Sequence, residues 1–179
     1  MANKFNKIKE TGYDYVDNSY KIKKEVINLV SKLSSRWSYL LQQPIDKLAS
    51  TQFDFIRMAY KYRVNDYEDY LMKSWYLKNS KATLQALEVR VLDLYDVLST
   101  NPSKVFSRKN GKNYNYATSI RMLDKKFEEL GIAFTKQYKL IDGLLSSLKK
   151  KKMEFKDTNI DEDKIIMNMA SKYFQNFFE

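Results

Sequence analysis

The chain has 179 residues, of which 44% are hydrophobic and 30% charged, a balance typical of one folded domain rather than a disordered chain. It contains no cysteine and no histidine, which excludes disulfides, thiolate metal sites, a cysteine nucleophile and the commonest general base. The formal net charge of +10, from 32 basic and 22 acidic residues, favours a polyanionic partner. Nucleic acid is the first such partner and anionic lipid the second, with simple solubility as the alternative.

The composition favours helices and a location inside the cell. Only four Gly and two Pro interrupt a sequence rich in Lys, Glu, Leu and Ala, which are good helix formers. No apolar run approaches the roughly 18 residues that span a bilayer, and no apolar segment follows the first charged residues. We therefore expect no membrane helix and no signal peptide, and the lack of cysteine suits a cytoplasmic protein.

The N-terminal region is predicted to contain an arm and two helices. Residues 1–19 combine lysines with a run of Tyr, Asp and Asn, and we expect a basic N-terminal arm there. Apolar residues at helical spacing predict a first helix from Tyr20 to Gln43. Pro44 should end it and allow a second helix, from Ile45 to Val64, to start close by.

The stretch from Tyr67 to Ser99 has the clearest helical pattern, because apolar residues recur every seven positions without a Gly or Pro, and Asp66 can cap it. About 33 residues at 1.5 Å each make a rod of roughly 50 Å, which needs neighbours of similar length. A second apolar line, Trp75, Ala82 and Val89, lies on the opposite side. Either the apolar seam widens at one end of the helix, or this line is an interface with another subunit.

The C-terminal half is predicted to contain one long loop and two more helices. Thr100 to Asn113 is rich in turn residues and has no apolar period, and a fourth helix follows from about Asn115. Four lysines, Lys149 to Lys152, should link it to an amphipathic helix over residues 160–178. That helix must bury its apolar face on the bundle, on a sister subunit or on another protein.

These elements predict an all-α fold. We expect an antiparallel up-down four-helix bundle over residues 20–148, with a basic loop between its third and fourth helices. Residues 149–179 should form the Lys-rich linker and an extra C-terminal amphipathic helix.

Basic residues are expected to gather in two places. In an antiparallel bundle, residues 20–25, 57–81 and 136–142 would share one pole with a net charge of +6. Cations neutralise phosphates and aromatic rings stack on unpaired bases, the chemistry of binding single-stranded RNA or DNA. The candidate nucleic-acid-binding residues are Lys21, Lys24, Arg57, Lys61, Arg63, Lys73 and Lys81 at the pole, and Lys104, Arg108, Lys109 and Lys112 in the long loop. For any single lysine the alternative is an ordinary solvated surface.

Enzyme chemistry has little support in the sequence. The carboxylates are too scattered to suggest a metal site or a general acid–base pair, and no Gly-rich phosphate loop occurs. The serines have no histidine to activate them. We expect neither catalysis nor a cofactor or metal.

The order of features resembles a known family. A helix ending at Gln42-Gln43-Pro44, a tight turn into a long third helix, and Phe127-Glu128-Glu129-Leu130-Gly131 in the fourth are similar to a four-helix-bundle family, over about Tyr20 to Tyr138. That family includes the accessory variability determinant proteins of diversity-generating retroelements and the proteins encoded in ribosomal-RNA intervening sequences. Here Ile132 and Phe134 follow the glycine, where the family usually has a basic residue and later a Trp.

The resemblance implies a basic, non-catalytic bundle that assembles as a ring, typically a pentamer, and binds a reverse transcriptase and its template RNA. Our leading hypothesis is therefore an oligomeric RNA-binding accessory protein of a reverse transcriptase in a retroelement system. The alternative is a helical scaffold of a phage or mobile element that binds proteins and has no nucleic-acid role.

Overall fold

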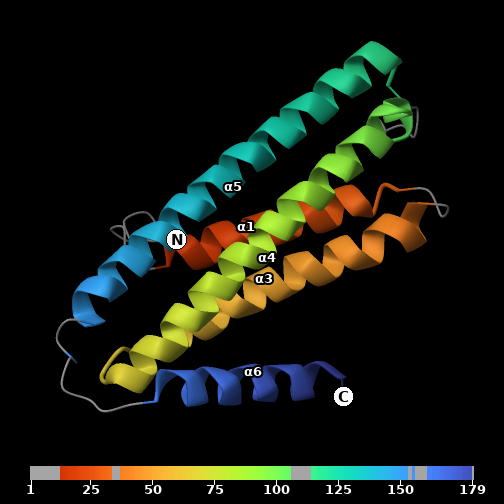
Figure 1. Cartoon of the computed structure of the whole chain (residues 1–179). Coiled ribbons are helices and arrows are strands. Elements are labelled where there is room, and N and C mark those ends of the chain that lie inside the picture. The colour runs from red at the N-terminus through yellow and green to blue at the C-terminus, as the bar shows by residue number, and fades with distance from the viewer. Residues whose placement is uncertain (1–12, 34–36, 106–113, 153–154, 156–160, 179) are drawn as a thin grey trace, which may run out of the picture.

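The computed structural model describes residues 13–33, 37–105, 114–152, 155 and 161–178, and these residues form helices and turns with no strand. The predicted all-α fold is thus confirmed (Figure 1). The α-helices are α1 (Asp14–Val30), α3 (Gln43–Lys61), α4 (Tyr67–Ser99), α5 (Tyr116–Lys152) and α6 (Glu162–Phe178). A π-helical turn, η1 (Ser38–Gln42), leads into α3, and a short 3-10 helix, η2 (Pro102–Lys104), follows α4.

The four long helices α1, α3, α4 and α5 pack around one core in a bundle-like arrangement. Contacts join α1 to α3, α3 to α4, α4 to α5 and α5 back to α1, so each of them has two of the others as neighbours (Figure 1). Their apolar faces supply the largest fully buried side chains, which include Ile22, Ile45, Ile56, Leu77, Leu84, Leu123, Phe134 and Ile141. Burying such faces is the main favourable term in folding.

The long helix α4 has the bounds that the sequence predicts. Tyr70, Leu77, Leu84 and the later members of its seven-residue repeat are buried, because residues seven apart lie on one side of a helix. The side chain of Asp66 caps the first turn, where it accepts a hydrogen bond of 2.8 Å from the backbone N–H of Asp69. The seam and the cap together define this helix.

The first helix begins six residues earlier than predicted. α1 starts at Asp14, so residues 14–19 belong to the bundle and not to an N-terminal arm; the rest of the predicted arm, residues 1–12, lies outside the described residues. Tyr, Asp and Asn have weak helix propensity, but tertiary packing overrides it here. Tyr15, Asn18 and Ser19 are buried, and they share the helix face of Ile22.

The predicted helix from Tyr20 to Gln43 is also wrong at its other end, because α1 stops at Val30. The Ser31 hydroxyl donates to the carbonyl of Asn28, and serine side chains bonded to the backbone favour helix ends. Pro44 lies instead in the first turn of α3. Proline lacks an N–H and crowds the carbonyl four residues before it, and the wider π turn of η1 accommodates both effects.

The lysine run that the sequence assigns to a linker is helical. α5 continues through Lys149–Lys152, and α6 follows close to the predicted place. Lys152 pairs with Glu162 of α6 at 3.1 Å and lies 5.6 Å from the ring centre of Tyr67, whose hydroxyl also contacts Glu162. The start of α6 is therefore held against the start of α4, with which α6 makes contacts.

A layer of buried polar side chains crosses the core near its middle. Gln52 of α3 accepts from Ser19 of α1 (2.6 Å) and donates to Ser80 of α4 (3.1 Å). On the other side of α1, Asn18 donates to Gln137 of α5 (2.9 Å), and Gln137 donates to the Tyr15 carbonyl (3.0 Å). Buried polar groups need such partners, so this layer links all four helices at one level.

Candidate nucleic-acid interface

Cations and aromatic rings lie together where α1 packs on α3. Phe53 lies at the centre: Lys23 is 5.3 Å and Arg57 5.8 Å from its ring centre, and Tyr20 packs on it at 5.5 Å. About two turns further towards the end of α3, the rings of Tyr13 and Tyr60 are 4.9 Å apart. We call this surface the basic–aromatic face, and its members are Tyr13, Tyr20, Lys23, Phe53, Arg57 and Tyr60.

The basic–aromatic face is accessible to a ligand. Tyr13, Tyr20 and Tyr60 keep 51%, 54% and 38% of their surface exposed, although they are large and partly apolar. Exposed rings beside cations provide both stacking surfaces for bases and neutralisation for phosphates. The sequence signals this face only on α3, where Phe53, Arg57 and Tyr60 are spaced so that they lie on one side of the helix. The sequence prediction included Arg57 but none of these rings.

The basic–aromatic face continues through Tyr60 into a pocket of about 670 Å³. The turn after α3, the start of α4 and the end of α5 line this terminal pocket. Its charged and aromatic lining residues are Tyr15, Tyr60, Lys61, Tyr62, Arg63, Lys73 and Lys151, and no described Asp or Glu is among its lining residues. The pocket thus combines four cations and three tyrosines from distant parts of the sequence.

Lys73 is the most enclosed of the four cations. Its ammonium donates a hydrogen bond of 3.0 Å to the carbonyl of Tyr62 and is half-buried. Burial lowers the pKa of Lys73, and the nearby positive charge of Lys151 lowers it further. Burial also raises the pKa of Tyr15, to about 12, so its hydroxyl stays neutral.

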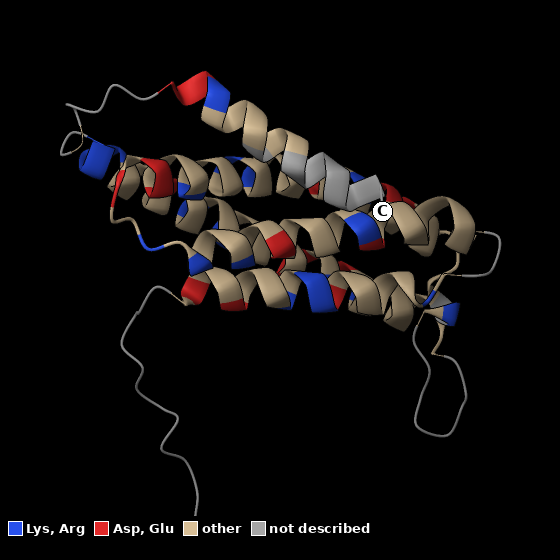
Figure 2. Cartoon of the chain, turned by 90° about the horizontal axis from the view of Figure 1, so that it is seen from below, with Lys and Arg blue, Asp and Glu red and all other residues tan. Residues whose placement is uncertain are grey.

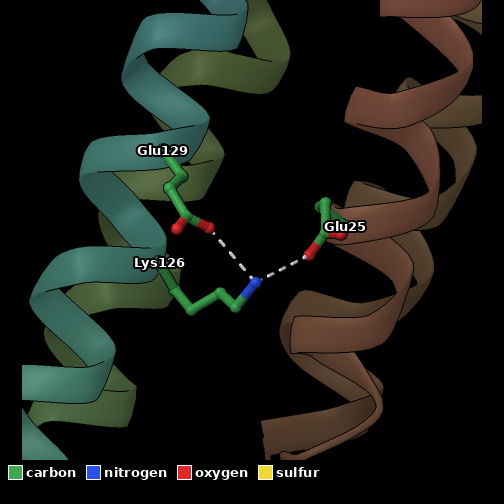
Figure 3. A network of polar contacts seen from close by, with 3 residues as sticks. All are labelled: Glu25, Lys126 and Glu129. Carbon is green, nitrogen blue, oxygen red and sulfur yellow. Dashed lines mark hydrogen bonds and ion pairs between the residues drawn. The ribbon is translucent and has the colours of Figure 1, made fainter.

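Three of the predicted pole residues, Lys21, Lys24 and Lys81, lie outside both this pocket and the basic–aromatic face. Lys21 and Lys24 are exposed on α1, and Lys21 lies in a small cleft where two lysines, Lys21 and Lys126, are balanced by Glu25 and Glu129. In that cleft Lys126 of α5 lies 3.5 Å from Glu25 of α1 and so links the two helices. It also lies 3.2 Å from Glu129 of its own helix (Figure 3). Lys81 pairs with Asp142 at 2.6 Å and is already neutralised by it. Nearby carboxylates make Lys21 and Lys81 poor candidates for phosphate contacts, whereas Lys24 stays a prediction.

Only part of the predicted pole with a charge of +6 lies at one end: of its cations, Arg57, Lys61, Arg63 and Lys73 do, and the others lie further along the bundle. Because α1 starts at Asp14, residues 20–25, 75–81 and 136–142 lie along the bundle, and among the described residues the end with the terminal pocket carries almost as many carboxylates as cations. The cations there are Arg57, Lys61, Arg63, Lys73, Lys149, Lys150, Lys151, Lys152 and Lys164, and the carboxylates are Asp14, Asp17, Asp66, Glu68, Asp69, Asp161, Glu162 and Asp163. Figure 2 shows both signs interspersed along the helices. Positive charge is therefore concentrated locally, in the pocket.

Lys104 is the one cation of the predicted basic loop that lies within the described residues. α4 has 33 residues and spans roughly 50 Å, and Lys104 follows the end of α4 that is remote from the terminal pocket, so Lys104 does not contribute to that pocket (Figure 1). Lys104 is exposed at the end of η2. Arg108, Lys109 and Lys112 lie outside the described residues.

The three residues of the predicted interface line on α4 lie in different environments. Trp75 packs edge-on against Phe55 of α3, with ring centres 5.9 Å apart, which matches the explanation that the seam widens at this end. Ala82 is exposed, and Val89 is 61% exposed. Val89 lies near an apolar groove of about 430 Å³ between α4 and α5, which Leu92 and Phe127 help to line. The three residues do not form one continuous surface.

Together these surfaces define an all-helical protein with a local basic and aromatic site. Within the described residues, no three His, Cys, Asp or Glu side chains are placed to hold a metal ion, and none of the helices contains an apolar stretch of the length needed to span a bilayer. No protein-family model matches the chain, and comparisons with characterised proteins and with solved structures find no significant match either.

Proposed function

We propose that this protein is a non-catalytic, oligomeric RNA-binding accessory protein, and that it holds single-stranded RNA on its basic–aromatic face. The observation that carries the proposal is the placement of two cations, Lys23 at 5.3 Å and Arg57 at 5.8 Å, beside the ring centre of Phe53, on which Tyr20 also packs. Exposed aromatic rings flanked by cations are suited to unpaired bases and phosphates, and they favour single strands over duplexes.

The fold and the family resemblance support a more specific role. We infer that α1, α3, α4 and α5 form an antiparallel up-down four-helix bundle to which α6 is added, since each contacts two others and the α3–α4 connection is short. The resemblance to retroelement accessory proteins suggests a reverse transcriptase as the protein partner, its template RNA as the ligand, and a ring-shaped homo-oligomer, typically a pentamer.

Fluorescence anisotropy with a labelled single-stranded RNA tests the proposed function. Affinity should fall steeply between low and physiological salt, and the double variant Lys23→Met with Arg57→Met should reduce the magnitude of the salt slope by about 0.7 for each phosphate that is no longer neutralised. The matched control is Arg121→Met with Lys125→Met, which removes two exposed cations of α5. Equal slopes in both double variants would refute binding on the basic–aromatic face.

A second variant isolates the stacking. Phe53→Leu keeps an apolar side chain between α1 and α3 but removes the ring, so it should weaken RNA binding by roughly 1–3 kcal/mol, the value of one stacked base. Unchanged affinity in Phe53→Leu would mean that Phe53 only supports its neighbours.

A second candidate function is a scaffold that binds proteins and not nucleic acid. It is favoured by the exposed apolar residues around the α4–α5 groove, where Val89, Leu92 and Ile132 are 61%, 62% and 63% exposed. Val89→Lys with Leu92→Lys should dissociate an oligomer that uses this surface, as measured by light scattering. A salt-insensitive RNA signal together with a stable partner complex would favour the scaffold function.

A further inference from the structure

The terminal pocket contains a cation that its neighbours do not neutralise. The ammonium of Lys73 is half-buried, its partner there is the neutral carbonyl of Tyr62, and no described carboxylate lines the pocket. None of the ion pairs among the described residues uses Lys61, Arg63, Lys73 or Lys151. Withdrawing an ammonium from water without an anion is unfavourable, so the pocket is suited to an anionic ligand.

The arrangement of donors limits the chemistry of that ligand. Lys61 and Arg63 come from the turn after α3, Lys73 from α4 and Lys151 from α5, so the cations surround the pocket instead of lining one wall. Such an arrangement suits an anion with several acceptor oxygens. A guanidinium can bind two phosphate oxygens side by side, and ammonium groups add point charges around them.

The volume and the aromatic rings of the pocket indicate a ligand larger than a single phosphate group. About 670 Å³ lies within the range of small-molecule sites and exceeds what one phosphate group fills. Tyr15, Tyr60 and Tyr62 contribute aromatic surface, and Tyr60 is shared with the basic–aromatic face. A planar base with its phosphate would use both the rings and the cations.

We propose that the terminal pocket binds one nucleoside phosphate, with the phosphate among Arg63, Lys73 and Lys151 and the base against Tyr60. The nucleotide belongs to an RNA strand that runs along the basic–aromatic face, and in this respect the inference rests on the proposed function. A free mononucleotide offers the same chemistry, and the experiment separates the two sources.

Calorimetric titration of the full chain tests the pocket directly. Adenosine 5′-monophosphate should bind at least tenfold more tightly than either adenosine or inorganic phosphate, because each of these lacks half of the recognised groups. Arg63→Met and Lys73→Met should each weaken binding of the monophosphate by about tenfold to a hundredfold, as expected when a hydrogen bond to a charged group is removed. Arg63 is exposed, so its variant tests the pocket even if Lys73→Met fails to fold.

Lys125→Met is the matched control. It removes one exposed cation from the same helix as Lys151, about 39 Å away along α5, and it should leave binding of the monophosphate unchanged. A loss in Lys125→Met equal to that in Arg63→Met would overturn the pocket proposal, because net charge alone would then explain the affinity.

A decamer of single-stranded RNA distinguishes the pocket from the proposed function. Competition between the decamer and the monophosphate, with both weakened by Arg63→Met, supports a strand nucleotide in the pocket. Binding of the monophosphate without binding of the decamer supports the pocket as a site for free nucleotides and refutes the proposed function. Decamer binding that is equal in the wild type and in both pocket variants, with no signal from the monophosphate, overturns the pocket proposal and leaves the proposed function standing.

Discussion

Gln137 is the polar residue whose contribution to stability follows most directly from the structure. Its side chain is fully buried on α5, accepts a hydrogen bond of 2.9 Å from Asn18 and donates one of 3.0 Å to the Tyr15 carbonyl. Gln137→Met keeps an unbranched side chain of similar volume and removes both bonds. At about 0.5–1.5 kcal/mol for each hydrogen bond, we expect the free energy of unfolding to fall by roughly 1–3 kcal/mol.

Urea unfolding measures this loss, provided that the denaturant slope stays constant. The control is Gln85→Met, the same exchange at an exposed position of α4, which should change the free energy of unfolding by less than about 0.5 kcal/mol. Asn18→Leu combined with Gln137→Met should cost less than the two single losses added together, since an apolar pair leaves no unpaired partner. If Gln137→Met unfolds at the same urea concentration as Gln85→Met, the polar layer does not stabilise the bundle.

Three further predictions concern the core, a helix cap and alkaline pH. Leu84→Ala empties a fully buried position and should cost about 2–5 kcal/mol in urea unfolding, whereas Val89→Ala at an exposed position should cost less than about 0.5 kcal/mol. Asp66→Ala should lower stability by about 0.5–2 kcal/mol, and circular dichroism would show the first turn of α4 fraying. Tyr15 has a folded pKa of about 12, above its ordinary value near 10, so its stabilisation is complete below pH 10 and is lost as the pH rises from 10 to 12. Between pH 10 and pH 12 the free energy of unfolding should therefore fall by about 2–3 kcal/mol less in Tyr15→Phe than in the wild type. Equal falls in the two proteins would contradict a raised pKa for Tyr15.

The sequence predicts α4 well because every local signal agrees. A seven-residue repeat runs through it without a breaker, and Asp66 supplies a cap at its start. Where local signals and packing disagree, the prediction fails. The residues before Tyr20 have turn-like composition, but Tyr15 is buried and held in the core, and packing extends the helix there beyond what propensity suggests.

The candidate site is harder to predict, because it depends on how far each helix is shifted along its neighbours. The sequence places Lys61, Arg63 and Lys73 together, since a short turn joins α3 to α4. It does not place Lys151 beside them, because a linker was expected where α5 continues for another turn. The pairing of Lys81 with Asp142 depends on the same shift between α4 and α5.

The layer of buried polar side chains fixes how far α5 is shifted along its neighbours, and the sequence contains a signal of this layer. Leu123, Leu130, Gln137 and Leu144 are seven residues apart on α5, so Gln137 is the polar exception in an apolar line. A shift of α5 by one repeat would move it about 10 Å and still place apolar residues in the core, so the apolar seam alone does not select a register. That shift would break the bonds of Gln137 and carry Lys151 away from Lys73. The buried hydrogen bonds at the middle of the bundle thus determine whether the cations at its end form a pocket.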